Sequence, residues 1–100
     1  MEVALRAFPP GITQETLTQL LEDTRNREEL LQNTIRRFEQ RHGISLKALE
    51  ARLDHGGGSE HPDWEDSIEW RNAVETLQRT RVMRSLFEWL LRSIVPSLTS

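Results

Sequence analysis

Carboxylates gather in the middle of the chain, at a spacing that could support metal binding or proton transfer. Asp63, Asp66 and Glu69 follow one another at steps of three, so a helix would place them on one face. Such a face could bind a metal ion or act as a general acid or base. The first turn of a helix also favours acids without any chemistry, because its unpaired N–H groups are partly positive. The spacing therefore favours a solvated helix start over a catalytic site.

Three histidines, His42, His55 and His61, offer another route to a metal site, since imidazole and carboxylate both bind zinc. No two of them show the i, i+4 spacing of a helical zinc motif, and two flank a run of three glycines. The chain has no cysteine, which excludes disulfides and thiolate zinc sites. We expect no metal and no cofactor.

The glycine run also fails as a catalytic or nucleotide-binding loop. His55-Gly56-Gly57-Gly58 resembles the oxyanion loop of some esterases, but the Gly-x-Ser-x-Gly nucleophile elbow is missing. The run lacks the Lys-Ser/Thr pair of a phosphate loop and the spaced glycines of a dinucleotide site. We predict that the protein is not an enzyme.

Two tryptophans and an isoleucine lie among these acids, and this combination is typical of a recognition surface. Interfaces concentrate aromatic residues and arginine in a few strongly contributing positions. The same rings could instead form the core of their own domain. We predict that a partner protein contacts the following residues: Trp64, Asp66, Ile68, Glu69, Trp70 and Arg71.

The charge distribution favours a protein partner over nucleic acid. The net charge is −3, whereas a domain that binds phosphates is usually basic. Residues 54–69 hold six acids and no Lys or Arg, and residues 71–92 hold five arginines. One basic candidate is left, because Gly43-Ile44-Ser45 with Lys47 and Arg52 resembles a helix-turn-helix corner. A DNA-binding regulator is therefore the first alternative, and a small structural subunit of a larger assembly is the second.

Capping residues and apolar spacing predict an all-α protein with two long helices and one short helix. Thr13 can cap a first helix that Gly43 ends, and Ser45 can cap a short helix through Leu53. A third helix should begin at Asp63 and end before Pro96. We expect an arm at 1–12, a single helical domain at 13–95 with a flexible glycine-rich linker at 54–62, and a tail at 96–100. The helices should form a hairpin or a bundle that a partner or a second copy completes.

The end of the third helix is apolar on nearly every side, which a small domain cannot cover by itself. We predict that the chain forms homo-oligomers through the residues of this end: Leu86, Phe87, Trp89, Leu90 and Ile94. No apolar run approaches the roughly 18 residues of a membrane span, and the acidic start does not resemble a signal peptide. A cytoplasmic protein without membrane contact is expected.

Over roughly residues 31–91 the chain resembles small helical prokaryotic proteins that are commonly encoded as antitoxins beside a compact toxin. The resemblance depends on a few residues: Phe38, Gly43, Ser45, Asp66, Glu69 and Trp70. It implies an antitoxin-like binder that wraps or caps a toxin enzyme by stoichiometric binding, with Glu69 and Trp70 at or near the contact. The chain departs from this pattern in its first eleven residues and in its apolar end after Val82.

Overall fold

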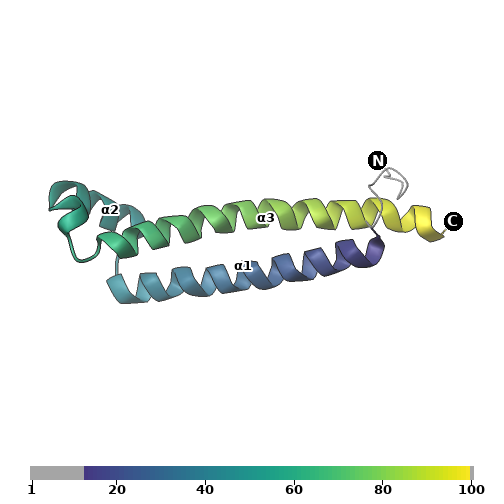
Figure 1. Ribbon diagram of the computed structural model, residues 1–100, viewed down its shortest axis with the longest axis horizontal. Coiled ribbons are helices and arrows are strands. Elements are labelled where there is room, and N and C mark those ends of the chain that lie inside the picture. The colour runs from purple at the N-terminus through teal and green to yellow at the C-terminus, as the bar shows by residue number, and fades with distance from the viewer. Residues whose placement is uncertain (1–12, 100) are drawn as a thin grey trace. The chain divides into compact units, whose positions relative to one another are not determined.

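The computed structural model describes residues 13–99, and the side chains of residues 13–93. It contains the α-helices α1 (Gln14–His42), α2 (Leu46–His55) and α3 (Trp64–Thr99), with the short 3-10 helix η2 (Gly58–Glu60) before α3 (Figure 1). There is no strand within residues 13–99. The prediction of an all-α chain with two long helices and one short helix is confirmed. None of these helices is long and apolar enough to cross a membrane.

Most helix ends lie where the capping residues predict them. The backbone N–H of Thr16 donates to Oγ1 of Thr13 at 3.1 Å, and that of Ala48 donates to Oγ of Ser45 at 3.1 Å. Gly43 has a φ of 66°, a left-handed conformation that glycine adopts without strain, and it follows the last residue of α1.

One predicted helix end differs from the structure, and one predicted feature cannot be compared with it. The prediction that the third helix ends before Pro96, with a tail at 96–100, is wrong, since α3 runs through Pro96 to Thr99. A proline removes one backbone hydrogen bond and crowds the preceding turn, which costs free energy but does not end every helix. The predicted arm at 1–12 lies outside the described residues.

The chain forms two compact units, each built from parts of α1 and α3. Unit 1 comprises Met1–Glu28 and Arg79–Ser100, and unit 2 comprises Glu29–Gln78 with α2 and η2. In unit 2, Phe38 contacts Trp70 and His42 contacts Asp66, so α1 and α3 are antiparallel there. In unit 1, Glu28 of α1 contacts Arg84 of α3. The two units are described separately below.

The core of unit 2 joins the apolar row of α2 to aromatic rings from α1 and α3. Leu49 is completely buried, and the indole of Trp70 stacks on the ring of Phe38 with 5.8 Å between centroids. The buried members of this core are Phe38, Leu46, Leu49, Leu53 and Trp70. Because the leucines of α2 recur at steps of three and four, α2 presents all of them to the same core.

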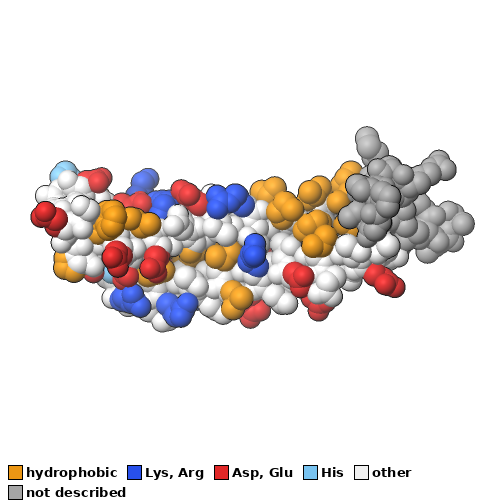
Figure 2. All heavy atoms as spheres, in the orientation of Figure 1, with side chains coloured by type: hydrophobic (Ala, Val, Ile, Leu, Met, Phe, Trp, Pro, Cys, Tyr) orange, Lys and Arg blue, Asp and Glu red, His pale blue; other side chains and the backbone are white. Residues whose placement is uncertain are grey.

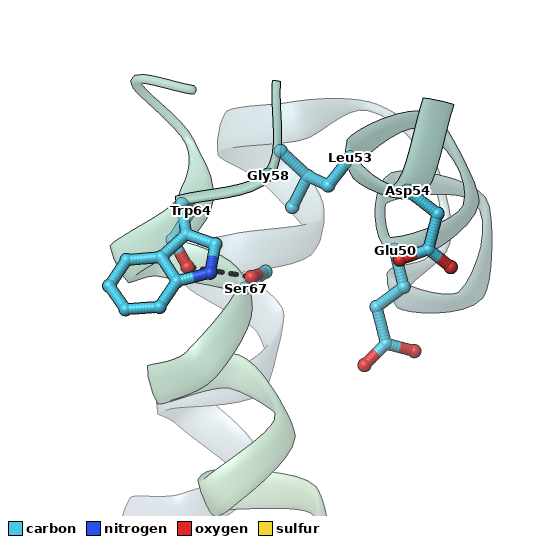
Figure 3. A pocket seen from close by; sticks show the side chains of 6 residues that line it. All are labelled: Glu50, Leu53, Asp54, Gly58, Trp64 and Ser67. Carbon is cyan, nitrogen blue, oxygen red and sulfur yellow. Dashed lines mark hydrogen bonds between the residues drawn. The ribbon is translucent and has the colours of Figure 1, made fainter. Parts of the chain in front are cut away.

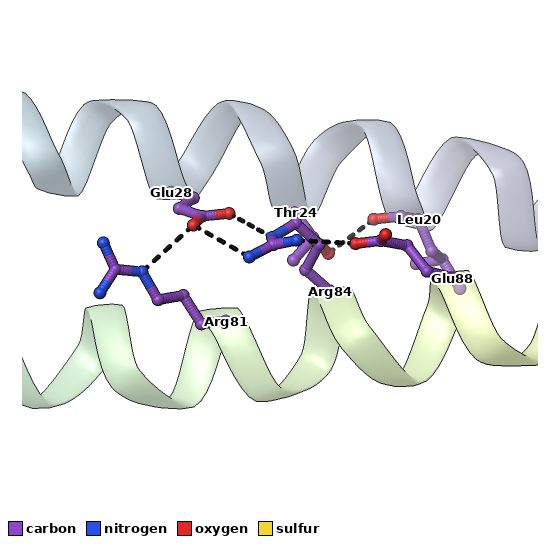
Figure 4. Close-up of polar contacts among 6 residues, drawn as sticks. All are labelled: Leu20, Thr24, Glu28, Arg81, Arg84 and Glu88. Carbon is purple, nitrogen blue, oxygen red and sulfur yellow. Dashed lines mark hydrogen bonds and ion pairs between the residues drawn. The ribbon is translucent and has the colours of Figure 1, made fainter.

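Unit 1 contains a polar network between α1 and α3. The carboxylate of Glu28 is 13 % exposed and accepts hydrogen bonds from Nε of Arg84 at 2.6 Å and Nε of Arg81 at 3.2 Å (Figure 4). A second nitrogen of Arg84 donates to Glu88 at 2.8 Å. Thr24 donates its hydroxyl to the backbone oxygen of Leu20 at 2.6 Å. Glu28 thus links α1 to α3 through two arginines, whereas Thr24 is paired within α1.

Candidate protein-binding site

The first two turns of α3 expose apolar side chains among acids. Trp64 is 37 % exposed and Ile68 is 40 % exposed, and they lie one helical turn apart on the same side of α3. Glu65 and Glu69 beside them are also exposed. We call the surface formed by Trp64, Glu65, Ile68 and Glu69 the Trp64 face. It combines partly exposed apolar area with negative charge.

A pocket of about 340 Å³ lies at the edge of the Trp64 face. It is lined by Glu50, Leu53 and Asp54 of α2, Gly58 of η2, and Trp64 and Ser67 of α3. Figure 3 shows the indole of Trp64 on one side of the pocket and the carboxylates of Glu50 and Asp54 on the other. The hydroxyl of Ser67 donates to the backbone oxygen of Trp64 at 2.6 Å. The pocket is therefore an acidic hollow with one aromatic wall.

The turn that closes the pocket requires glycine. Gly57 and Gly58 have φ angles of 106° and 51°, in the region that other residues rarely adopt. Their carbonyls accept backbone hydrogen bonds from Glu60 and His61, both at 3.1 Å. The glycine run thus forms a turn that brings the end of α2 next to the start of α3. The range 54–62, predicted as a linker, contains the last residues of α2 and the short helix η2, and its predicted flexibility stays a prediction.

One carboxylate of the pocket is held by an ion pair. Nε of Arg71 donates to Oε2 of Glu50 at 2.9 Å, and a second nitrogen of the same guanidinium donates to Oε1. The hydrogen bond from Arg71 lowers the pKa of Glu50, so this carboxyl stays ionised at neutral pH. Asp54 lies beside it with its side chain exposed. The pocket keeps negative charge even with Arg71 in place.

Asp66 contacts two basic residues of α1. Its Oδ2 lies 2.9 Å from a guanidinium nitrogen of Arg41 and 2.9 Å from Nε2 of His42. The hydrogen bond from Arg41 lowers the pKa of Asp66, and the one from His42 adds to the effect. Asp66 therefore ties the start of α3 to the end of α1 within unit 2.

Replacing Asp66 by Asn should lower the free energy of unfolding at pH 7 by about 1 kcal/mol, a modest value because Arg41 is largely exposed. A carboxyl whose pKa is lowered in the folded state stabilises the fold above its unfolded-state pKa. This contribution is lost as the pH falls through the folded-state pKa. The stabilities of the wild type and Asp66→Asn, measured by urea denaturation, should thus differ at pH 7 and converge as the pH falls through the lowered folded-state pKa of Asp66.

The matched control for this comparison is Glu39→Gln, which neutralises an exposed acid of α1. It should change stability by less than about 0.5 kcal/mol at neutral or acid pH. A difference between the wild type and Asp66→Asn that persists unchanged in acid would contradict the role given to the ionised carboxylate.

The six residues predicted to contact a partner have different environments in the structure. Trp64, Ile68 and Glu69 are exposed, whereas Asp66 and Arg71 are engaged in ion pairs. Trp70 is only 2 % exposed, because its indole stacks on both Phe38 and His42, each at 5.8 Å between centroids. Trp70 therefore belongs to the core beneath the Trp64 face. A partner can reach Trp64, Ile68 and Glu69 directly, and it can also reach the paired guanidinium of Arg71, whose side chain is 41 % exposed.

The residues predicted for oligomerisation lie in unit 1. Leu86 and Trp89 are 44 % and 39 % exposed, and Phe87 and Leu90 are half-buried. The side chain of Ile94 lies outside those that the structure describes. Figure 2 shows hydrophobic side chains gathered on the surface along the C-terminal half of α3.

The structure also bears on the metal site and the helix-turn-helix motif that the sequence analysis considered. Among the described residues, no group of three His, Asp or Glu side chains could hold a metal ion. α2 exposes Lys47 and Arg52, the two cations of the helix-turn-helix alternative. It also carries the acids Glu50 and Asp54, so its charge does not favour phosphate over a basic partner.

Sequence reasoning missed the α2 side of the pocket. Glu50 and Asp54 are spaced four apart, which places both on one face of a helix, and this signal is visible in the sequence. What the sequence does not show is that the glycine turn brings this face opposite Trp64. No protein-family model, curated protein or solved structure matches the chain.

Proposed function

We propose that this chain is a non-catalytic protein-binding module that binds a basic partner protein through the Trp64 face and its pocket. The observation that carries the proposal is the exposure of Trp64 and Ile68 beside an acidic pocket. By the resemblance to antitoxins, the partner would be an enzyme that the chain neutralises by covering it.

The exposed apolar pair supplies the contact area. A tryptophan offers a large rigid surface at little cost in side-chain entropy, which is why it often dominates binding energies. Trp64 is fixed by the first turn of α3, and Ile68 extends the same surface by one turn. The partner should therefore present a shallow apolar hollow to these two side chains.

The negative charge around the Trp64 face indicates that the partner surface should be basic. Residues 54–69 contribute six acids and no Lys or Arg, and Arg71 is already paired with Glu50. A basic side chain of the partner could enter the pocket, stack on the indole of Trp64 and pair with Asp54. Complementary charge of this kind mainly accelerates association and selects the partner. The affinity should consequently fall as salt is added.

A peptide of alternating arginine and glycine tests the pocket, with the same peptide carrying citrulline in place of arginine as the neutral control. The protein has three tryptophans, so its indole N–H groups give three resolvable NMR signals. The arginine peptide should shift the Trp64 signal and leave those of Trp70 and Trp89 in place. Asp54→Asn should weaken this binding at least about threefold, whereas Asp23→Asn on α1 should not.

Equal shifts with the citrulline peptide, or no shift at Trp64, would contradict the binding of a basic side chain. The natural partner can then be sought by capture from the native host with three baits: the wild type, Trp64→Ala and Trp89→Ala. A partner that uses the Trp64 face should be lost only with Trp64→Ala. Co-expression with that partner would then test neutralisation directly.

A further inference from the structure

One carboxylate of the pocket already binds a guanidinium, and this guanidinium belongs to the chain itself. Glu50 lines the pocket, and both of its carboxylate oxygens accept hydrogen bonds from Arg71. Such two-point pairing is the usual way in which a carboxylate recognises the planar, forked head of arginine. Arg71 therefore shows which chemical group Glu50 is oriented to accept.

Arg71 lies at the edge of the pocket. It follows Ser67, a residue that lines the pocket, by one turn of α3. Its side chain is 41 % exposed, and that of Glu50 is 33 % exposed. Ion pairs with this much exposure contribute little stability, because water screens the charges and a long side chain loses entropy when it is fixed. Arg71 can consequently leave Glu50 at a small cost in free energy.

The rest of the pocket suits the guanidinium of another protein. The indole of Trp64 lies across the hollow from the carboxylates of Glu50 and Asp54 (Figure 3). A guanidinium can stack on an indole and donate to carboxylates at the same time, because all its donors lie in its own plane. The ammonium of lysine has no flat face and binds a carboxylate as a point charge. The pocket should therefore prefer arginine to lysine.

We propose that Arg71 is an internal competitor, which an arginine of the partner displaces from Glu50 when it enters the pocket. This inference rests on the proposed function, because it requires that the pocket bind a basic side chain. In the free protein Glu50 is paired with Arg71, and Asp54 is exposed. In the complex both carboxylates pair with the incoming guanidinium, and Arg71 turns to solvent. Only a side chain that binds Glu50 better than Arg71 does completes the exchange.

The side-chain Nε–H signal of Arg71 reports this exchange directly in NMR spectra of the labelled protein. The unlabelled peptide of alternating arginine and glycine should move the signal toward the position that it has in Glu50→Gln, where its carboxylate partner is missing. The signal of Arg84, which pairs with Glu28 in unit 1, is the internal control and should stay in place. This measurement uses the wild-type chain, so it does not depend on the stability of any Arg71 variant.

The affinity for the same peptide measures the competition. Arg71→Gln should tighten binding about threefold, the size expected when an exposed ion pair no longer has to be broken. Arg52→Gln is the matched control, because Arg52 is an exposed arginine of α2 that is not paired with Glu50. It should change the affinity by less than about 1.5-fold at physiological salt. A peptide with lysine in place of each arginine should bind the wild type at least about threefold more weakly than the arginine peptide.

The results separate this exchange from the proposed function. The exchange is overturned if the arginine peptide binds while the Arg71 signal stays in place, or if Arg71→Gln binds no more tightly than the wild type and Arg52→Gln. Equal affinities for the arginine and lysine peptides also overturn it. In each of these cases the pocket still binds a basic side chain, so the proposed function stands. A wild-type chain that binds neither peptide contradicts the proposed function and the exchange together.

Discussion

Replacing Trp70 by alanine is expected to lower the free energy of unfolding by about 3–5 kcal/mol, as for other buried aromatic residues. The indole is 2 % exposed and stacks on Phe38 and His42, which lie on neighbouring turns of α1. Its removal leaves a cavity that the surrounding leucines of α2 cannot fill without moving. A protein of this size is stable by only about 5–15 kcal/mol, so the loss would be a large fraction of the total.

Urea denaturation followed by circular dichroism at low protein concentration measures this loss. The matched control is Trp89→Ala, which removes a 39 % exposed indole and should cost less than about 1 kcal/mol. If both variants lost the same stability, Trp70 would not have the core position described above. The comparison also separates stability from binding, because a folded Trp70→Ala chain retains Trp64 and Ile68.

The helices and their ends could largely be predicted from the sequence, because they depend on local interactions. The hydroxyls of Thr13 and Ser45 cap helices, and Gly43 ends one, through contacts that span three or four residues. The apolar row of α2 is equally local, since its leucines recur with the period of a helix. Such features need no knowledge of the rest of the chain.

The side of α3 that each tryptophan faces could not be predicted in this way. Trp64 and Trp70 lie six residues apart in the same acidic helix start, yet one is exposed and the other is buried. The difference depends on Phe38 and His42, which are 32 and 28 residues away from Trp70 in the chain. Periodicity describes one helix at a time, so it does not specify which face another helix will cover.

The ion pairs of the site could not be predicted from the sequence either, because their partners lie far apart in the chain. Arg71 pairs with Glu50 and Asp66 pairs with Arg41, at separations of 21 and 25 residues. From the sequence, Asp66 and Arg71 are indistinguishable from exposed charges that could meet a partner. The structure assigns both to contacts within unit 2. Of the six predicted contact residues, Trp70 is buried and Asp66 and Arg71 already have partners within unit 2, while the pocket adds Glu50 and Asp54 from α2.

Leu49→Ala should lower the free energy of unfolding by about 2–5 kcal/mol, since Leu49 is the one fully buried large side chain among the described residues. It lies between Leu46 and Leu53 on the apolar row of α2, so the cavity weakens the contact that holds the whole helix. Because α2 supplies Glu50 and Asp54, the pocket should lose its acidic side when α2 detaches.

Two measurements separate this local effect from a general loss of stability. Hydrogen exchange should accelerate most strongly at the amides of α2, and the arginine peptide should bind Leu49→Ala more weakly than the wild type. Leu30→Ala makes the same chemical change at a 67 % exposed position and should alter neither quantity. If Leu49→Ala destabilised the protein but bound the peptide at full strength under folding conditions, α2 would not form a wall of the binding site.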